Sequence, residues 1–110
     1  MKGEHLGELE ELVLLTIGSL YQEAYAVAIL DEIKKNTNRM MDVTAIHSVL
    51  RRLEKKGYAK SEMGGATAER GGRRKRFFVL TQVGRKVLDD TMELRVSLYS
   101  KLPKLAFTGI

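Results

Sequence analysis

Residues Glu69–Thr81 read ERGGRRKRFFVLT, in which five cations within seven residues are followed by four apolar side chains. Glycines beside the cations let the backbone adapt its conformation to a partner. The aromatic and branched residues that follow are typical of a strand whose side chains anchor in a core. A β-hairpin that touches DNA has this arrangement, because the protein must hold its stem while its tip carries positive charge. The segment therefore predicts a basic hairpin.

The residues on either side of the basic segment complete this hairpin. Tyr58–Met63 is predicted as the first strand, residues 64–72 as a glycine-rich tip and Arg74–Leu80 as the returning strand. Successive side chains of a strand alternate between its two faces, so Phe77 and Phe78 are expected to point in opposite directions.

Apolar residues recur at helical spacing in three segments before the hairpin and in one after it. Thr44 and Thr81 are placed to cap the third and fourth helices, and Gly57 is placed to end the third. The order predicts a mainly α fold with a small β-hairpin, namely a winged helix-turn-helix plus a C-terminal dimerisation helix. The predicted helices span Leu6 or Glu8 to Leu20, Tyr25 to Lys35, Thr44 to Lys56 and Thr81 to Lys101.

The first and last of these helices carry more apolar surface than one contact requires. A helix that is apolar nearly all round is buried on more than one side. A chain of 110 residues buries a modest share of its surface, so a second subunit would supply the missing cover. We expect residues 1–80 to form the DNA-binding domain and residues 81–110 to form a dimerisation helix and tail. The expected interface residues are Leu12, Leu15, Leu94 and Leu98.

The formal net charge of +5 is concentrated in one block of the chain. Residues 43–88 carry twelve cations and three anions, whereas residues 1–42 carry four cations and eight anions. A basic block on a protein that is otherwise neutral or acidic indicates a polyanion partner. The plainer interpretation of the same block is a solubilising surface.

The sequence offers little for catalysis, a metal or a membrane. The chain has no cysteine, and His47 and Ser48 point about 100° apart on a helix, so they form no nucleophile–base pair. The acidic pairs Glu10–Glu11 and Asp89–Asp90 lie at predicted helix beginnings, where the helix dipole favours them. The longest apolar run has seven residues, against roughly 20 for a membrane span. We expect a cytoplasmic protein that is no enzyme, with no cofactor, no metal and no membrane contact.

The exposed face of the third predicted helix is cationic, as in a recognition helix. Such a helix enters the major groove of DNA with its N-terminal half near the base edges. Thr44, His47 and Ser48 are predicted to lie there, and the cations further along are predicted to meet phosphates. The plainer interpretation is an amphipathic helix with a solvated charged face. The predicted phosphate contacts of this helix are Arg51, Arg52 and Lys55.

Cations of the hairpin are predicted to contact the phosphate backbone and the minor groove. Those on alternating strand faces cannot all touch one duplex, so only some of them are expected to bind. The alternative role is a charged edge that prevents strand-to-strand aggregation, and the two roles are compatible. The predicted DNA contacts of the hairpin are Arg70, Arg73, Arg74 and Lys75.

The ordered set of these motifs resembles the PadR family of bacterial transcriptional regulators, over about Leu6–Leu88. The start Leu6–Gly7 and a tyrosine opening the second helix, Tyr25, are similar to the family. The third helix also ends as in the family, with the sequence LRRLEKKG at Leu50–Gly57. The wing and the helix cap that follows it, Glu69–Gly84, are similar to the family as well. The C-terminal region, a single short helix plus a tail, resembles the short branch of the family.

The resemblance implies a homodimer in which the last helix packs against the first helix of the other subunit. It also implies repression through a near-palindromic operator in double-stranded DNA, relieved by a small-molecule effector or another signal. His47 and Ser48 stand where the family usually has Tyr-Pro, so base readout is expected to differ. The competing hypothesis is a winged-helix protein-interaction module whose basic block binds an acidic protein partner.

Overall fold

The structure is a computed structural model that describes residues 6–64 and 74–104. Within these residues the elements follow the predicted order, with one short 3₁₀ helix added after the first helix. The mainly helical fold with a small antiparallel hairpin is therefore confirmed. In chain order the elements are α1 (Glu8–Leu20), η1 (Tyr21–Glu23), α2 (Ala26–Asn36), α3 (Val43–Lys55), β1 (Ala59–Met63), β2 (Arg76–Leu80) and α4 (Gln82–Ser100).

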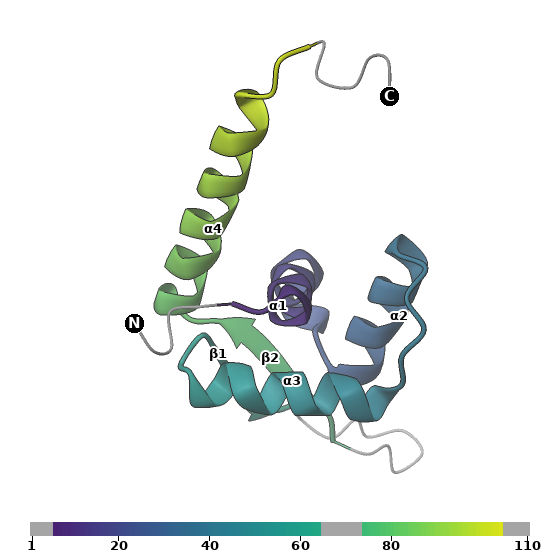
Figure 1. Cartoon of the computed structure of the whole chain (residues 1–110). Helices are drawn as coiled ribbons and strands as arrows, with labels where there is room; N and C mark the ends of the chain where they lie inside the picture. Colours follow the sequence, from purple (N-terminus) through teal and green to yellow (C-terminus); the bar gives the residue numbers. More distant parts are fainter. Residues whose placement is uncertain (1–5, 65–73, 105–110) are drawn as a thin grey trace.

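Helix α1 is the centre of the fold, and it contacts α2, α3, β2 and α4. Figure 1 shows α1 almost end-on between α2 and α4, with α3 and the hairpin running beneath it. The first half of α4 lies near this body, while its second half rises away from it. Helix α3 and the hairpin thus share one side of the molecule, and the residues of α4 after Met92 are exposed.

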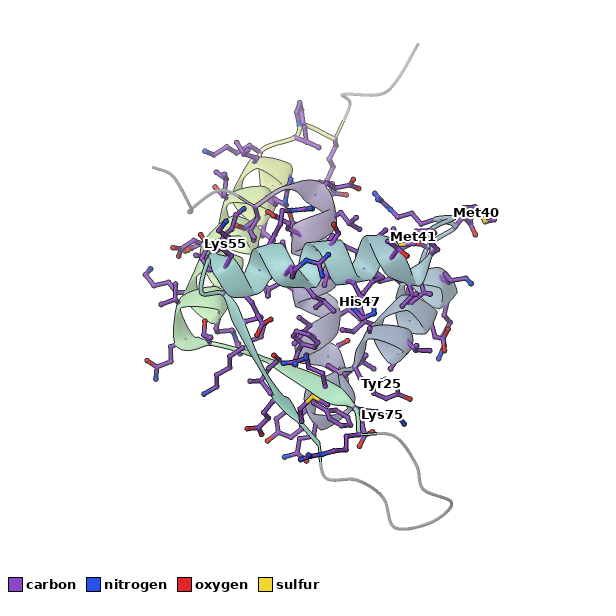
Figure 2. The ribbon with its side chains drawn as sticks, turned by 90° about the horizontal axis from the view of Figure 1, so that it is seen from below. Tyr25, Met40, Met41, His47, Lys55 and Lys75 are labelled. Atoms are coloured by element: carbon purple, nitrogen blue, oxygen red, sulfur yellow. The ribbon has the colours of Figure 1, made fainter. Side chains whose placement is uncertain are left out.

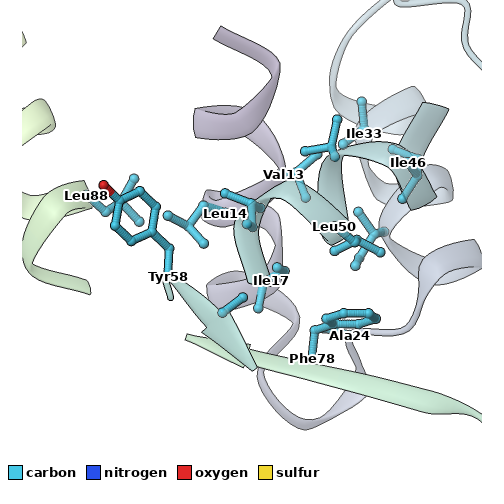
Figure 3. Packing of buried hydrophobic residues seen from close by; sticks show 14 of the residues in the cluster. Val13, Leu14, Ile17, Ala24, Ile33, Ile46, Leu50, Tyr58, Phe78 and Leu88 are labelled. Carbon is cyan, nitrogen blue, oxygen red and sulfur yellow. The ribbon is translucent and has the colours of Figure 1, made fainter. Parts of the chain in front are cut away.

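One hydrophobic cluster joins all of these elements. Ile17 and Leu14 of α1 and Leu50 of α3 are almost completely buried, and Phe78 brings β2 into the same cluster. Figure 3 shows Leu88 of α4 lying beside Tyr58 at one end of the cluster. The hairpin and the start of α4 are therefore anchored in the same core as the helix-turn-helix.

The hairpin pairs β1 with β2 in an antiparallel register that sets Ser61 opposite Phe78. Phe78 is buried and Val79 is exposed, which confirms the predicted alternation of faces. The other edge of β2 is also held, because the Phe78 N–H donates to the Ala24 carbonyl at 2.8 Å. The first strand begins one residue later than predicted, since the Tyr58 N–H donates to the Leu53 carbonyl at the end of α3.

The cap predicted for α3 was wrong by two residues. Asp42 is the N-cap, and its carboxylate accepts the Ala45 N–H at 3.1 Å, while Thr44 lies inside the first turn. A carboxylate at this position also meets the positive end of the helix dipole, which a hydroxyl does not. The predicted stop is confirmed, because Gly57 has a φ of 82° that favours glycine.

Thr81 caps α4 as predicted, and its hydroxyl has two partners. It accepts the Gly84 N–H at 2.9 Å and donates to the Gly57 carbonyl at 2.6 Å. The Thr81 N–H also donates to the Tyr58 carbonyl at 3.1 Å. The residue that begins α4 is thus tied to the chain that leaves α3, so the end of α3 and the start of α4 are fixed to each other.

Candidate nucleic-acid interface

Helix α3 buries its apolar residues against α1 and α2 and turns its polar residues outward. Ile46, Val49, Leu50 and Leu53 form the buried face. The opposite face looks toward the viewer in Figure 2, with Met41 just before the start of the helix and Lys55 at its end. Of the residues predicted to contact DNA from this helix, Ser48 is half-buried, and the exposed ones are Thr44, His47, Arg51, Arg52 and Lys55.

A groove of about 790 Å³ lies between the start of α2, helix α3 and the start of β2. His47 and Arg51 line it from α3, and Figure 2 shows Tyr25 and Lys75 close together on the hairpin side. Glu54 is the only carboxylate among its described lining residues. The cations that line the groove are Arg51, Arg74, Lys75 and Arg76. The fold therefore joins two segments that the sequence predicted separately into one cationic surface.

Arg52 and Lys56 lie on the side of α3 that meets α1, where both bind Glu10. The Arg52 Nε donates to one Glu10 carboxylate oxygen at 3.2 Å, and the Lys56 Nζ donates to the other at 2.8 Å. Glu10 also accepts the Gly7 N–H at 2.9 Å. Part of the positive charge of α3 is thus balanced within the protein, and the exposed fraction of the Arg52 side chain is still 52%.

Burial of Glu10 by itself raises the pKa of its carboxyl group. Hydrogen bonds from Lys56, the Gly7 N–H and Arg52 outweigh burial, so the pKa lies below its usual value. The carboxylate is therefore ionised whenever the protein is near neutral pH. The sequence explained Glu10 by its favourable interaction with the helix dipole, and the bonds to Arg52 and Lys56 are a second role.

Arg76 is held on the hairpin instead of pointing freely into the groove. Its guanidinium donates to the Ser61 hydroxyl at 3.0 Å, and that hydroxyl donates to a Glu54 carboxylate oxygen at 2.6 Å. This chain of bonds links β2, β1 and α3. Arg76, which was not among the predicted DNA contacts, thus has partners within the protein.

Two of the four predicted wing contacts, Arg70 and Arg73, lie outside the described residues. Arg74 and Lys75 are described, and both are exposed. The Arg74 Nε donates to the Gly64 carbonyl at 3.3 Å across the hairpin. Tyr25 also lines the groove but was not among the predicted site residues, although its position just before α2 and the paired aromatics in β2 were available as signals.

The residues predicted for a dimer interface are largely uncovered in the single chain. Leu94 and Leu98 of α4 are 60% and 57% exposed, and Leu15 of α1 is 39% exposed, while Leu12 is half-buried. Next to them, the Arg95 guanidinium donates to the Glu11 carboxylate at 2.8 and 3.0 Å. This pair fixes the middle of α4 against α1.

Neither a metal cluster nor a membrane helix is found in the described part of the chain. Residues 6–64 and 74–104 contain no group of three or more side chains suited to hold a metal ion. None of their helices is long and apolar enough to cross a membrane.

A family model described as the transcriptional regulator PadR-like family matches residues 12–90. The chain is similar to the structure of a PadR family transcriptional regulator from Eggerthella lenta DSM 2243, with 25% identity over 93% of this chain and 88% of that one and a TM-score of 0.67. It is also similar in fold to a PadR-like transcription factor from Bacteroides fragilis, with 20% identity, 84% of each chain covered and a TM-score of 0.69. A comparison with curated proteins gave no match.

Proposed function

Because this chain belongs to the PadR-like family of transcriptional regulators, which are not enzymes, we propose that it represses transcription as a homodimer bound to double-stranded DNA. The operator would be near-palindromic, because a two-fold symmetric dimer presents two copies of α3 to successive major grooves. A small molecule or another signal would relieve repression. Since the target is chromosomal DNA, we place the protein in the cytoplasm.

The cationic groove between α3 and the start of β2 is the observation that carries this proposal. A DNA backbone needs positive charge on a surface that is continuous over several phosphates. Arg51, Arg74 and Lys75 provide such a surface, and the exposed His47 in the N-terminal half of α3 lines the same groove. A solvated charged face would not require cations from distant parts of the sequence to converge on one groove.

The groove suggests a division of roles among the residues. Thr44, His47 and Ser48 would lie near base edges, whereas the arginines and lysines would meet phosphates. Because Arg52 is shared with Glu10, we expect it to contribute less than its neighbour Arg51. The proposed phosphate contacts are Arg51, Arg52, Lys55, Arg70, Arg73, Arg74 and Lys75.

Arg51→Ala is expected to weaken binding to all DNA sequences about tenfold. It should also reduce the slope of log affinity against log salt concentration, by about one for each phosphate contact that is lost. His47→Ala should instead change the sequences that are selected from a random pool. Anisotropy titrations at several salt concentrations, with labelled duplexes from the region upstream of the gene, measure the first effect, and selection of bound duplexes from a random pool measures the second.

Lys101→Ala is the matched control for that experiment, because it removes one exposed cation at the end of α4, far from the groove. Its affinity and salt slope should equal those of the wild type. If the wild-type protein binds DNA without any dependence on ionic strength, or binds only an acidic protein, the proposed function is wrong.

The uncovered apolar surface of α4 supports the proposed homodimer. More than half of the Leu94 and Leu98 side chains is exposed, and both lie on the same side of the helix. Packing them on Leu12 and Leu15 of a second copy would remove apolar area from water on both subunits. We therefore propose residues 1–80 as the DNA-binding domain and residues 81–110 as the dimerisation helix and tail.

The double variant Leu94→Glu, Leu98→Glu is expected to be monomeric, because two carboxylates would be buried in each half of the interface. Val96→Glu is the control, since Val96 is 65% exposed but lies on the opposite side of α4 from the two leucines. Sedimentation analysis at one protein concentration measures the mass of each. A double variant that sediments as a dimer would contradict the proposed interface.

A further inference from the structure

The ring of Tyr25 contacts two side chains at the start of β2. It packs edge-to-face on Phe77, with ring centroids 5.6 Å apart and planes at 73°. The Lys75 ammonium lies over the same ring, 4.4 Å from its centroid. This is the distance range in which a cation is attracted to the negative face of an aromatic ring. Figure 2 shows Tyr25 and Lys75 together at this end of the hairpin.

The backbone around Tyr25 keeps this contact in place. The Phe78 N–H donates to the carbonyl of Ala24, the residue just before Tyr25, so the strand and the start of α2 cannot separate without breaking that bond. Tyr25 is also the N-cap residue of α2, which fixes its backbone at a helix end. The ring is therefore attached to a rigid part of the fold.

Lys75 is otherwise an unrestrained cation. Among the described residues it takes part in none of the ion pairs, whereas Arg76 next to it is bound to Ser61. A free lysine loses rotamer entropy when it meets a phosphate, and holding it in advance lowers that cost. An ammonium has three donors, and a ring face occupies one side of it, so donors remain for another partner.

We propose that Tyr25 is a positioning residue for DNA, whose ring holds the Lys75 ammonium at the groove so that it meets a phosphate beside α3. The inference rests on the proposed DNA-binding function and adds a residue to it. Tyr25 and Lys75 line the same groove as His47 and Arg51, so one backbone strand between α3 and the wing would pass all four.

Tyr25→Leu should weaken binding about threefold, because it removes the ring face that holds Lys75. Tyr25→Phe keeps the ring and should bind like the wild type. The probes are a labelled duplex carrying the site recovered from a random pool and a second duplex of unrelated sequence. Because the contact is to a phosphate, the loss should be the same for both duplexes.

A double-mutant cycle with Lys75→Met measures the part of the affinity that depends on the contact between Tyr25 and Lys75. In the Lys75→Met background Tyr25→Leu should have no further effect on affinity, whereas in a Lys60→Met background it should keep its threefold effect. Lys60 is a matched control because it is an exposed lysine of the same hairpin, on β1. Thermal unfolding of each variant checks that loss of the Phe77 contact has not unfolded the hairpin.

Fluorinated phenylalanines at position 25 give a second test that preserves packing. They keep the ring volume but remove negative charge from its face, so affinity should fall stepwise with fluorine content.

If wild-type binding is salt-dependent but affinity does not follow fluorine content, or the effects of Tyr25→Leu and Lys75→Met on affinity are additive, the inference is wrong and the proposed function stands. A Tyr25→Phe variant as weak as Tyr25→Leu would also overturn it, since the hydroxyl would then be the active group. Wild-type protein that binds neither duplex would overturn both.

Discussion

Gly84→Ala is expected to lower the free energy of unfolding by about 3 kcal/mol, because the added methyl group meets a closer contact here than at any other glycine in the described residues. A Cβ atom at this position would lie 1.9 Å from the Tyr58 carbonyl oxygen and 2.7 Å from its carbonyl carbon. Both are backbone atoms, so the clash cannot be relieved by rotating a side chain. Either the first turn of α4 or the start of β1 must move.

Helix propensity acts in the opposite direction and is too small to compensate. Alanine is better than glycine inside a helix by about 1 kcal/mol, and this gain applies to Gly84 as to any helical glycine. Gly18 in α1 provides the control, because a Cβ there would meet only the flexible end of the Leu80 side chain, at 3.2 Å. Gly18→Ala is therefore expected to leave the stability unchanged or slightly higher.

Thermal unfolding of the two variants at equal protein concentration measures this difference. Gly84→Ala should lower the Tm by more than about 10 °C. A Tm at or above that of the wild type would show that α4 does not approach the hairpin as closely as the structure has it. In the proposed homodimer, the Gly84 turn would set the direction in which α4 leaves the helix-turn-helix, and hence the spacing of the two α3 helices.

The parts of this fold that could be predicted from the sequence are those with local signals. Gly57 ends a helix because its own φ favours glycine, and Thr81 caps α4 because its hydroxyl reaches a backbone N–H three residues away. The alternation of Phe77 and Phe78 follows from strand geometry alone. Even the error at Thr44 was local, since the better capping group stands two residues earlier at Asp42.

The parts that sequence reasoning missed depend on residues that are far apart in the chain. Glu10 binds Arg52 across 42 positions, and Glu11 binds Arg95 across 84 positions. Adjacent carboxylates at a helix beginning are explained equally well by the helix dipole, so no local pattern distinguishes the two roles. Tyr25 is another such residue, because its partner Lys75 comes near it only when Phe78 of β2 is hydrogen-bonded to Ala24, the residue before Tyr25.

Glu10→Gln is expected to lower the free energy of unfolding by about 2 kcal/mol at neutral pH. The variant keeps the size of the side chain and removes the charge that binds Lys56 and Arg52. The cost is smaller than for a fully buried pair, because 27% of the Lys56 side chain and 52% of the Arg52 side chain remain exposed and can be solvated. Glu8→Gln is the control, since Glu8 lies on the same helix and pairs with Arg39 at the surface.

The pH dependence of the stability distinguishes loss of the Glu10 charge from loss of the packing of its side chain. Because the pKa of Glu10 is lower in the folded protein than its usual value, its charge stabilises the fold fully above the unfolded pKa of about 4.3. That contribution is lost as the pH falls through the folded pKa. The stability difference between wild type and Glu10→Gln should therefore be constant near neutrality and shrink below about pH 4.3. Denaturant titrations across this range measure it. A difference that persists in acid would assign the role of Glu10 to packing, and α3 would then be held against α1 without an ion pair.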